Sequence, residues 1–126
     1  MNPADLFRLE TETINLSPGQ IVFNEGDKGD LLYVLLEGAV QIRVGEVVVE
    51  TAERGAIFGE MALIDDSPRS ASAVATAPSR IVGVNRRRFQ FLVQQTPNFA
   101  LHVMRVLADR LRRMDRILGA RKESGS

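Results

Sequence analysis

The sequence predicts a mainly β protein, an antiparallel barrel or sandwich, with helices after its last strand. Up to about residue 84, short segments rich in valine and isoleucine are separated by glycines, a pattern typical of antiparallel β domains. Beyond that point apolar residues recur every three or four positions, which is the period of a helix. The 126 residues include no cysteine, so a single core of ordinary size must hold the fold without disulfides.

The first elements follow from local residue chemistry. A short helix is expected between Asn2 and Leu9, because Asn-Pro supplies a cap and a suitable first helical residue. The next segments are a turn at Ser17-Pro18-Gly19, a strand at 21–23, a polar loop at 24–30 and a strand at 31–36.

A β-hairpin is expected next. Apolar and polar residues alternate from Val40 to Val44, which predicts a strand with one buried face. Gly45-Glu46 separates this strand from a run of three valines at 47–49. Glycine at the first position of a two-residue loop favours a type II′ turn.

Helical periodicity begins near Phe89, is interrupted at Thr96-Pro97-Asn98, and resumes in a longer helix from about Phe99 to Leu118. Apolar residues of the longer helix follow heptad spacing and form a seam, namely Ala100, Met104, Leu107, Leu111, Met114 and Leu118. Such a seam can pack on the barrel or on a second copy of the chain. The charges beside it, such as Arg110 and Asp115, slightly favour self-association.

Charge limits the function classes. The formal net charge is zero, so the molecule lacks the broad positive field of a non-specific nucleic-acid binder. Basic residues predominate from Arg105 to Lys122 and in the triplet 86–88. Both clusters are interpreted first as solvated helix faces, with an acidic partner, a membrane surface or nucleic acid as alternatives. No apolar run approaches the roughly 20 residues of a membrane span, and a cytoplasmic protein is expected.

The stretch FGEMALIDDSPRSASAV, from Phe58 to Val74, places charged residues in an apolar segment. A short helix is expected from Glu60 to Ile64, and its first N–H groups, with Gly59 beside them, favour an anion. The guanidinium of Arg69 suits one phosphate. Glu60 either accepts a hydroxyl from another part of that ligand or forms a structural ion pair with Arg69, and both readings stay open.

Enzymatic readings find little support. The only histidine is His102, in the predicted long helix. A jelly-roll metalloenzyme needs clustered histidines and carboxylates, and a serine hydrolase needs a base near its nucleophile. We therefore expect a non-enzymatic binding module with no catalytic residues, no metal site and no cofactor.

The segment GEMALIDDSPRSASAV resembles the phosphate-binding cassette of cyclic-nucleotide-binding domains, and LSPGQIVFNEGDKGDLLYVLLEGAVQI resembles the first strands of that family. The resemblance extends from about Leu9 to Leu118. It implies an eight-stranded antiparallel jelly-roll barrel with a short N-terminal helix and two C-terminal helices. One domain, 1–126, is expected, with the barrel at about 10–85, the C-terminal helices at about 86–119 and a tail at 120–126.

The resemblance also implies roles for individual residues. Glu60 would accept the ribose 2′-hydroxyl, and Arg69 would bind the cyclic phosphate. Backbone or hydroxyl donors would come from Gly59, Met61, Ala62, Ser70 and Ala71. The base would meet the apolar Ile42 and Val49, the Ser72 hydroxyl, and the turn of the long helix that carries Arg110, Met114 and Asp115.

The expected function is a sensor that binds cyclic AMP, with cyclic GMP second, and relays binding through its C-terminal helices to a homodimer interface or a protein partner. Met114 replaces a polar residue that some members use to read adenine, so the base preference stays open. Too few residues follow Leu118 for a recognition helix, so DNA binding is not expected. Because Met1 stands close to the first expected helix, a stand-alone sensor is preferred over an excised domain. The alternative is a degenerate cassette that serves only as a dimerisation or docking scaffold.

Overall fold

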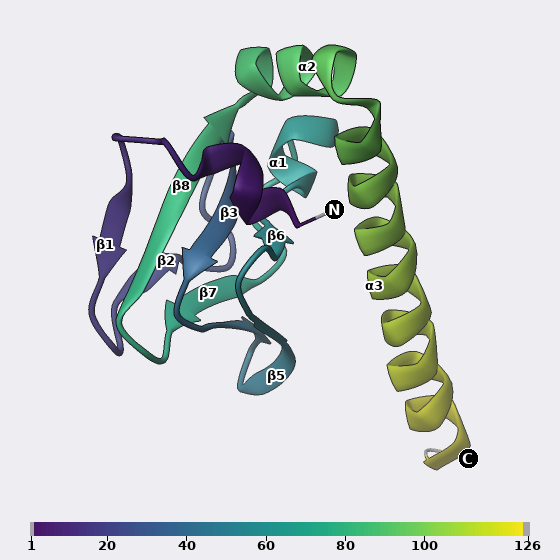
Figure 1. Ribbon diagram of the computed structural model, residues 1–126. Helices are drawn as coiled ribbons and strands as arrows, with labels where there is room; N and C mark the ends of the chain where they lie inside the picture. Colours follow the sequence, from purple (N-terminus) through teal and green to yellow (C-terminus); the bar gives the residue numbers. More distant parts are fainter. Residues whose placement is uncertain (1, 125–126) are drawn as a thin grey trace. The chain divides into compact units, whose positions relative to one another are not determined.

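The computed structural model describes residues 2–124. The chain divides into two compact units, one from Asn2 to Phe91 and a second that begins at Leu92. The first unit holds the strands (Figure 1). Each unit is described by itself below.

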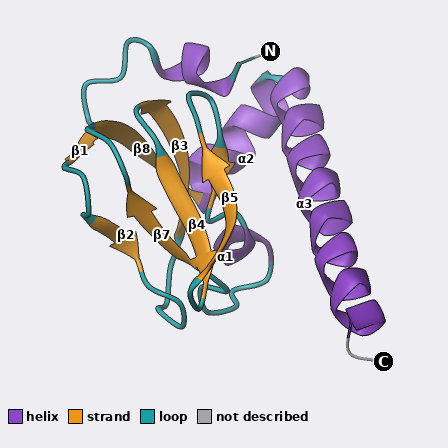
Figure 2. Cartoon of the chain, turned by 90° about the horizontal axis from the view of Figure 1, so that it is seen from below, coloured by secondary structure: helices purple, strands orange, loops and turns teal. Residues whose placement is uncertain are grey.

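Within the described residues, eight short strands form two antiparallel sheets of four strands each. Their bounds are β1 Ile14–Leu16, β2 Ile21–Phe23, β3 Leu31–Glu37, β4 Val40–Val44, β5 Val47–Ala52, β6 Ile57–Phe58, β7 Ser72–Ala75 and β8 Ser79–Asn85. One sheet has the order β1-β8-β3-β6 and the other the order β2-β7-β4-β5, in which β4 lies between β7 and β5 (Figure 2). This architecture confirms the predicted jelly-roll fold class.

The hydrophobic core takes side chains from both sheets. Buried members include Leu35 and Ile81 from the first sheet and Val40 and Ala73 from the second. The predicted hairpin is also present, since Val44 pairs with Val47 across a two-residue loop. The predicted alternation of burial is not observed along this strand, because only Val40 is buried, residues 41–43 are half-buried and Val44 is exposed.

Two short helical elements lie against β3. The first is the 3-10 helix η1 (Pro3–Phe7), and the Asn2 side chain caps it by accepting from the Ala4 N–H at 2.9 Å. The second is α1 (Met61–Ile64), which follows β6. The expected N-terminal helix is thus confirmed in a 3-10 form, which short helices often take.

Two helices follow β8, namely α2 (Arg86–Gln95) and α3 (Pro97–Ser124). They are separated at Thr96, as predicted, because Pro97 cannot continue the hydrogen-bonding of α2. The predicted end of the long helix at Leu118 was wrong, since α3 continues to Ser124. A single glycine such as Gly119 costs a helix only about 1 kcal/mol. In the part of the chain that is described, no helix is both long and apolar enough to cross a bilayer.

The arginine triplet at 86–88 forms ion pairs between the start of α2 and two other segments. Arg86 forms an ion pair with Asp66 at 2.7 Å, and Arg88 forms one with Glu10 at 2.6 Å. The Arg88 guanidinium also lies 5.0 Å from the centre of the Phe7 ring. Two of the three arginines therefore have structural roles, and the simple interpretation as a solvated face is incomplete.

Replacing Glu10 with glutamine is expected to lower the free energy of unfolding at neutral pH by less than about 1 kcal/mol, because Arg88 is partly exposed and its charge is screened. The hydrogen bond from Arg88 lowers the pKa of Glu10, while desolvation opposes it. A lowered folded-state pKa gives stability that is complete above the unfolded pKa and is lost as the pH falls through the folded pKa. Urea unfolding should therefore show the gap between variant and wild type closing below about pH 4.

The control for this variant is Glu37→Gln, because Glu37 pairs with Arg80 through a side chain that is 64% exposed. We expect a smaller difference there. A gap at Glu10 that persists unchanged in acid would contradict the electrostatic explanation.

Candidate functional site

The predicted cassette lies between two strands of the first unit. Strand β6 ends at Phe58, and Gly59 follows with φ at +76°, a conformation that side chains rarely adopt. A Cβ atom at this position would also lie 2.7 Å from Nη1 of Arg69. Gly59 is therefore required both by the turn and by the guanidinium that lies against it.

Arg69 points inward and is only 7% exposed. Its Nη1 donates to the Gly59 carbonyl at 2.7 Å, and its Nη2 donates to the Leu31 carbonyl at 2.8 Å. Its backbone is held as well, since its N–H donates to the Asp27 carbonyl and its carbonyl accepts from the Gly26 N–H, both at 2.8 Å. The polar loop before β3 thus holds Arg69 in place by its backbone.

Aromatic rings lie against the guanidinium. Cζ of Arg69 is 4.3 Å from the centre of the Phe23 ring and 5.7 Å from the centre of the Tyr33 ring. These two rings stack at 6.0 Å, and Phe58 completes a cluster of three. Burial raises the pKa of Tyr33, although the Arg69 charge acts against this. The phenol is therefore neutral at physiological pH.

One polar atom of this arrangement is unsatisfied. Nε of Arg69 is buried and has no hydrogen-bond partner. The guanidinium is held by the carbonyls of Gly59 and Leu31 and by aromatic rings. Burying a cation is costly, and so is leaving one of its donors unpaired. The site therefore combines an unused donor with a buried positive charge that lies against carbonyl dipoles and rings.

Gly29 faces the same atom. A Cβ atom on Gly29 would lie 2.3 Å from Nε of Arg69 and 2.4 Å from Cζ, which is far closer than any real contact. The bare backbone at this position leaves room for the guanidinium. Sequence reasoning missed this role, although a second glycine in the polar loop NEGDKGD was a signal.

Glu60 is the other charged residue of the cassette. It directly precedes α1 and is 5% exposed, and its side chain makes no capping hydrogen bond to that helix. With four residues, α1 has little macrodipole, so the anion argument rests on Arg69 more than on the helix.

The remaining predicted cassette residues differ in exposure. Ala62 is buried, Met61 and Ser70 are exposed, and Ala71 and Ser72 are half-buried. Oγ of Ser72 accepts a hydrogen bond from the Glu25 N–H at 3.0 Å. The hydroxyl proton of Ser72 is not used by that bond, so this residue keeps one donor.

The predicted base-facing residues come from both units. Ile42 lies on β4, where it pairs with Ala73 of β7 and packs on the core, and Val49 lies half-buried on β5. Arg110 and Met114 lie on α3 in the second unit, and the side chain of Met114 is outside the described residues. Their proposed contacts with a base remain predictions.

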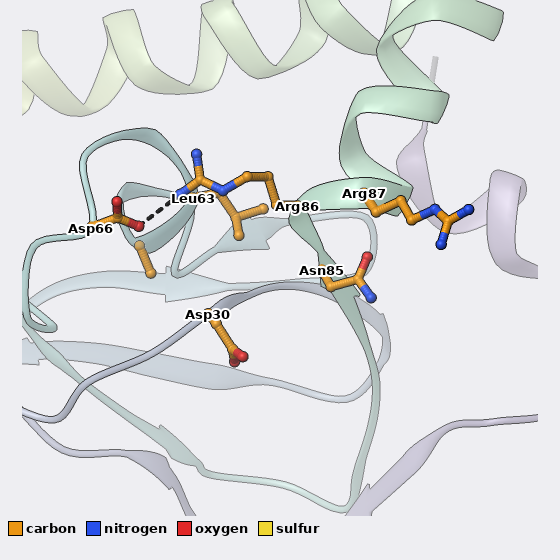
Figure 3. Close-up of a pocket in the computed structure, with 7 residues that line it drawn as sticks. Asp30, Leu63, Asp66, Asn85, Arg86 and Arg87 are labelled. Carbon is orange, nitrogen blue, oxygen red and sulfur yellow. Dashed lines mark hydrogen bonds and ion pairs between the residues drawn. The ribbon is translucent and has the colours of Figure 1, made fainter.

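A cavity of about 240 Å³ lies beside the cassette (Figure 3). Its lining comes from the loop before β3, from α1 and the loop after it, and from the junction of β8 with α2, namely Asp30, Ala62, Leu63, Asp66, Asn85, Arg86 and Arg87. Arg86 reaches across to Asp66, and Arg87 points away from that pair. Of the predicted site residues only Ala62 is among these lining residues. The sequence did not predict the cavity, because its walls come from three separate stretches of the chain.

Known proteins resemble this chain in sequence and fold. The family model of the "Cyclic nucleotide-binding domain" matches residues 13–96. A cAMP-dependent protein kinase regulatory subunit from Hypocrea atroviridis is 37% identical over 82 residues, which are 65% of this chain and 18% of that protein. A cGMP-dependent protein kinase from Eimeria tenella is 40% identical over 72 residues, which are 57% of this chain and 7% of that protein.

Among solved structures, the Thermus thermophilus catabolite activator protein is similar with a TM-score of 0.79 and 30% identity. The match covers 95% of this chain and 59% of that chain. The chain thus spans less than two thirds of each of these three proteins. Because the family model matches more than half of its residues, the chain belongs to the cyclic nucleotide-binding domain family.

Proposed function

We propose that this chain is a non-enzymatic sensor that binds cyclic AMP, with cyclic GMP as the second choice, in the cassette around Arg69. The observation that carries the proposal is the buried, unpartnered Nε of Arg69. A cyclic phosphate would supply the missing acceptor together with a negative charge beside the guanidinium. Charge-assisted hydrogen bonds of this kind are among the strongest that a protein makes.

The other residues take roles around that anchor. Glu60 accepts the ribose 2′-hydroxyl, while Gly59, Met61, Ala62, Ser70 and Ala71 supply donors from the backbone or a hydroxyl. Ile42 and Val49 offer apolar contact to the base, and Arg110 and Met114 belong to a helix that closes over it. The donor left on Ser72 suits either purine, so the base preference depends on contacts beyond the cassette.

Calorimetric titration of the purified protein with cyclic AMP and cyclic GMP tests the proposal. We expect saturable binding of both, with cyclic AMP tighter, and no binding of the linear nucleotide 5′-AMP at the same concentrations. No heat with either cyclic nucleotide would favour the alternative of a degenerate cassette that acts as a scaffold.

Replacing Glu60 with glutamine is expected to weaken cyclic-nucleotide binding less than removing the Arg69 side chain does. An amide oxygen still accepts the ribose hydroxyl, but a neutral acceptor is weaker by about 1 kcal/mol or somewhat more, a loss of roughly fivefold to tenfold. Calorimetry on the variant measures this directly. Complete loss of binding would instead mean that Glu60 mainly organises the cassette.

We further propose that binding is relayed to the C-terminal helices and that two copies associate through the heptad seam of α3. Support comes from exposure, since Met104 is 61% and Leu111 is 67% exposed. Light scattering with and without cyclic AMP measures the oligomeric state. A monomer under both conditions would leave a different protein partner as the target.

We also propose a cytoplasmic location, because a sequence without cysteine fits a reducing compartment.

A further inference from the structure

The aromatic cluster beside the cassette does more than fill the core. We propose that Phe23 and Tyr33 are positioning residues, whose ring faces hold the Arg69 guanidinium buried and oriented before any ligand arrives. This inference rests on the proposed function, because it concerns the group that is to bind the phosphate. It assigns to two residues outside the cassette a part in ligand affinity.

The geometry supports an attraction between charge and ring. The Phe23 ring centre is 4.3 Å from Cζ of Arg69 and the Tyr33 ring centre is 5.7 Å from it, both within the roughly 6 Å over which cation–π attraction operates. The attraction is larger in a site shielded from water, and Arg69 is 7% exposed. The two rings therefore stabilise the positive charge of a guanidinium that is shielded from water.

Holding the guanidinium matters because long side chains have many rotamers. Two carbonyls fix Nη1 and Nη2, but the unsatisfied Nε favours conformations in which Arg69 turns out to water. The apparent affinity for an anion is proportional to the fraction of molecules in which Arg69 points inward, so it falls when that fraction falls. The ring faces oppose this outward turn, so they raise affinity without touching the ligand.

Fluorinated phenylalanines separate charge attraction from packing, because fluorine withdraws electrons from the ring face while changing its size little. Mono-, di- and trifluorophenylalanine would be placed at position 23 of the full chain, and cyclic AMP affinity measured by calorimetry. We expect a stepwise fall, about threefold to tenfold in total. The same series at Phe58 is the control, because Phe58 packs on both rings and no cation–π contact with Arg69 is recorded for it in the described residues.

A second measurement does not need the ligand. The fall in melting temperature caused by trifluorophenylalanine at position 23 should largely disappear in an Arg69→Met background, because that background has no cation to lose. An equal fall in both backgrounds would overturn the inference. The inference would also be overturned if the wild type bound cyclic AMP tightly and the variants fluorinated at position 23 bound it equally well. Absence of nucleotide binding by the wild type, with the coupling intact, would count against the proposed function instead and leave the aromatic support for Arg69 standing.

Discussion

Replacing Arg69 with alanine is expected to weaken cyclic-nucleotide binding by thirtyfold or more. Removing one partner of a desolvated charge pair costs about 2–5 kcal/mol, and every 1.4 kcal/mol corresponds to about a tenfold change in affinity. Arg69 meets the condition of desolvation, since it is 7% exposed and its Nε is buried without a partner. Calorimetry with cyclic AMP, on variant and wild type in the same buffer, measures the loss.

Lysine at the same position should give an intermediate result. It keeps the charge and has three N–H donors, but they lie on one nitrogen, whereas Arg69 reaches the carbonyls of Gly59 and Leu31 from two separate nitrogens and keeps Nε in addition. The control is Arg80→Ala, which removes another arginine of the barrel, one that pairs with Glu37 on the surface. Unchanged affinity in the Arg69→Ala variant would contradict the proposal that this residue binds the cyclic phosphate.

The sequence predicted the charged positions of the site because they are local. Glu60 and Arg69 stand in one short segment among small residues, and that spacing alone indicated an anion-binding loop. The partners of Arg69 could not be found in this way. Its hydrogen bond to Leu31 joins positions 38 residues apart, and contacts at such separation leave no periodic signal in a single sequence.

The secondary structure, too, was predictable where the signal is local in sequence and not where it is weak or depends on distant residues. Alternation of apolar and polar residues predicted β4 and its hairpin, although burial falls along that strand from Val40 to Val44 and does not alternate. Neither β1 nor β7 was predicted as an individual strand. β1 has three residues, and β7 consists of Ser-Ala-Val-Ala, whose small side chains give little strand signal. The count of eight strands came from the family resemblance, and the roles of the arginine triplet depended on Glu10 and Asp66, which lie far from it in sequence.

Replacing Gly29 with alanine is expected to reduce nucleotide affinity nearly as much as Arg69→Ala, by tenfold or more, while leaving the melting temperature within a few degrees of wild type. The new methyl group would lie 2.3–2.4 Å from the guanidinium, so one of the two must move. Gly29 belongs to the loop whose Gly26 and Asp27 bond to the Arg69 backbone, whereas the guanidinium is the end of a flexible side chain. The guanidinium therefore turns outward, and the phosphate loses its main partner.

The small effect on stability has a physical reason. Arg69 gives up two hydrogen bonds, but its charge and its unsatisfied Nε return to water, and alanine lowers the entropy of the unfolded chain relative to glycine, which stabilises by about 0.4–1 kcal/mol. Combining Gly29→Ala with Arg69→Ala tests the mechanism, because the methyl group then fits into the space that the guanidinium leaves. The second substitution should add almost nothing to the loss of affinity caused by the first. If the double variant instead lost affinity by the product of the two single losses, Gly29 would affect the ligand independently of Arg69.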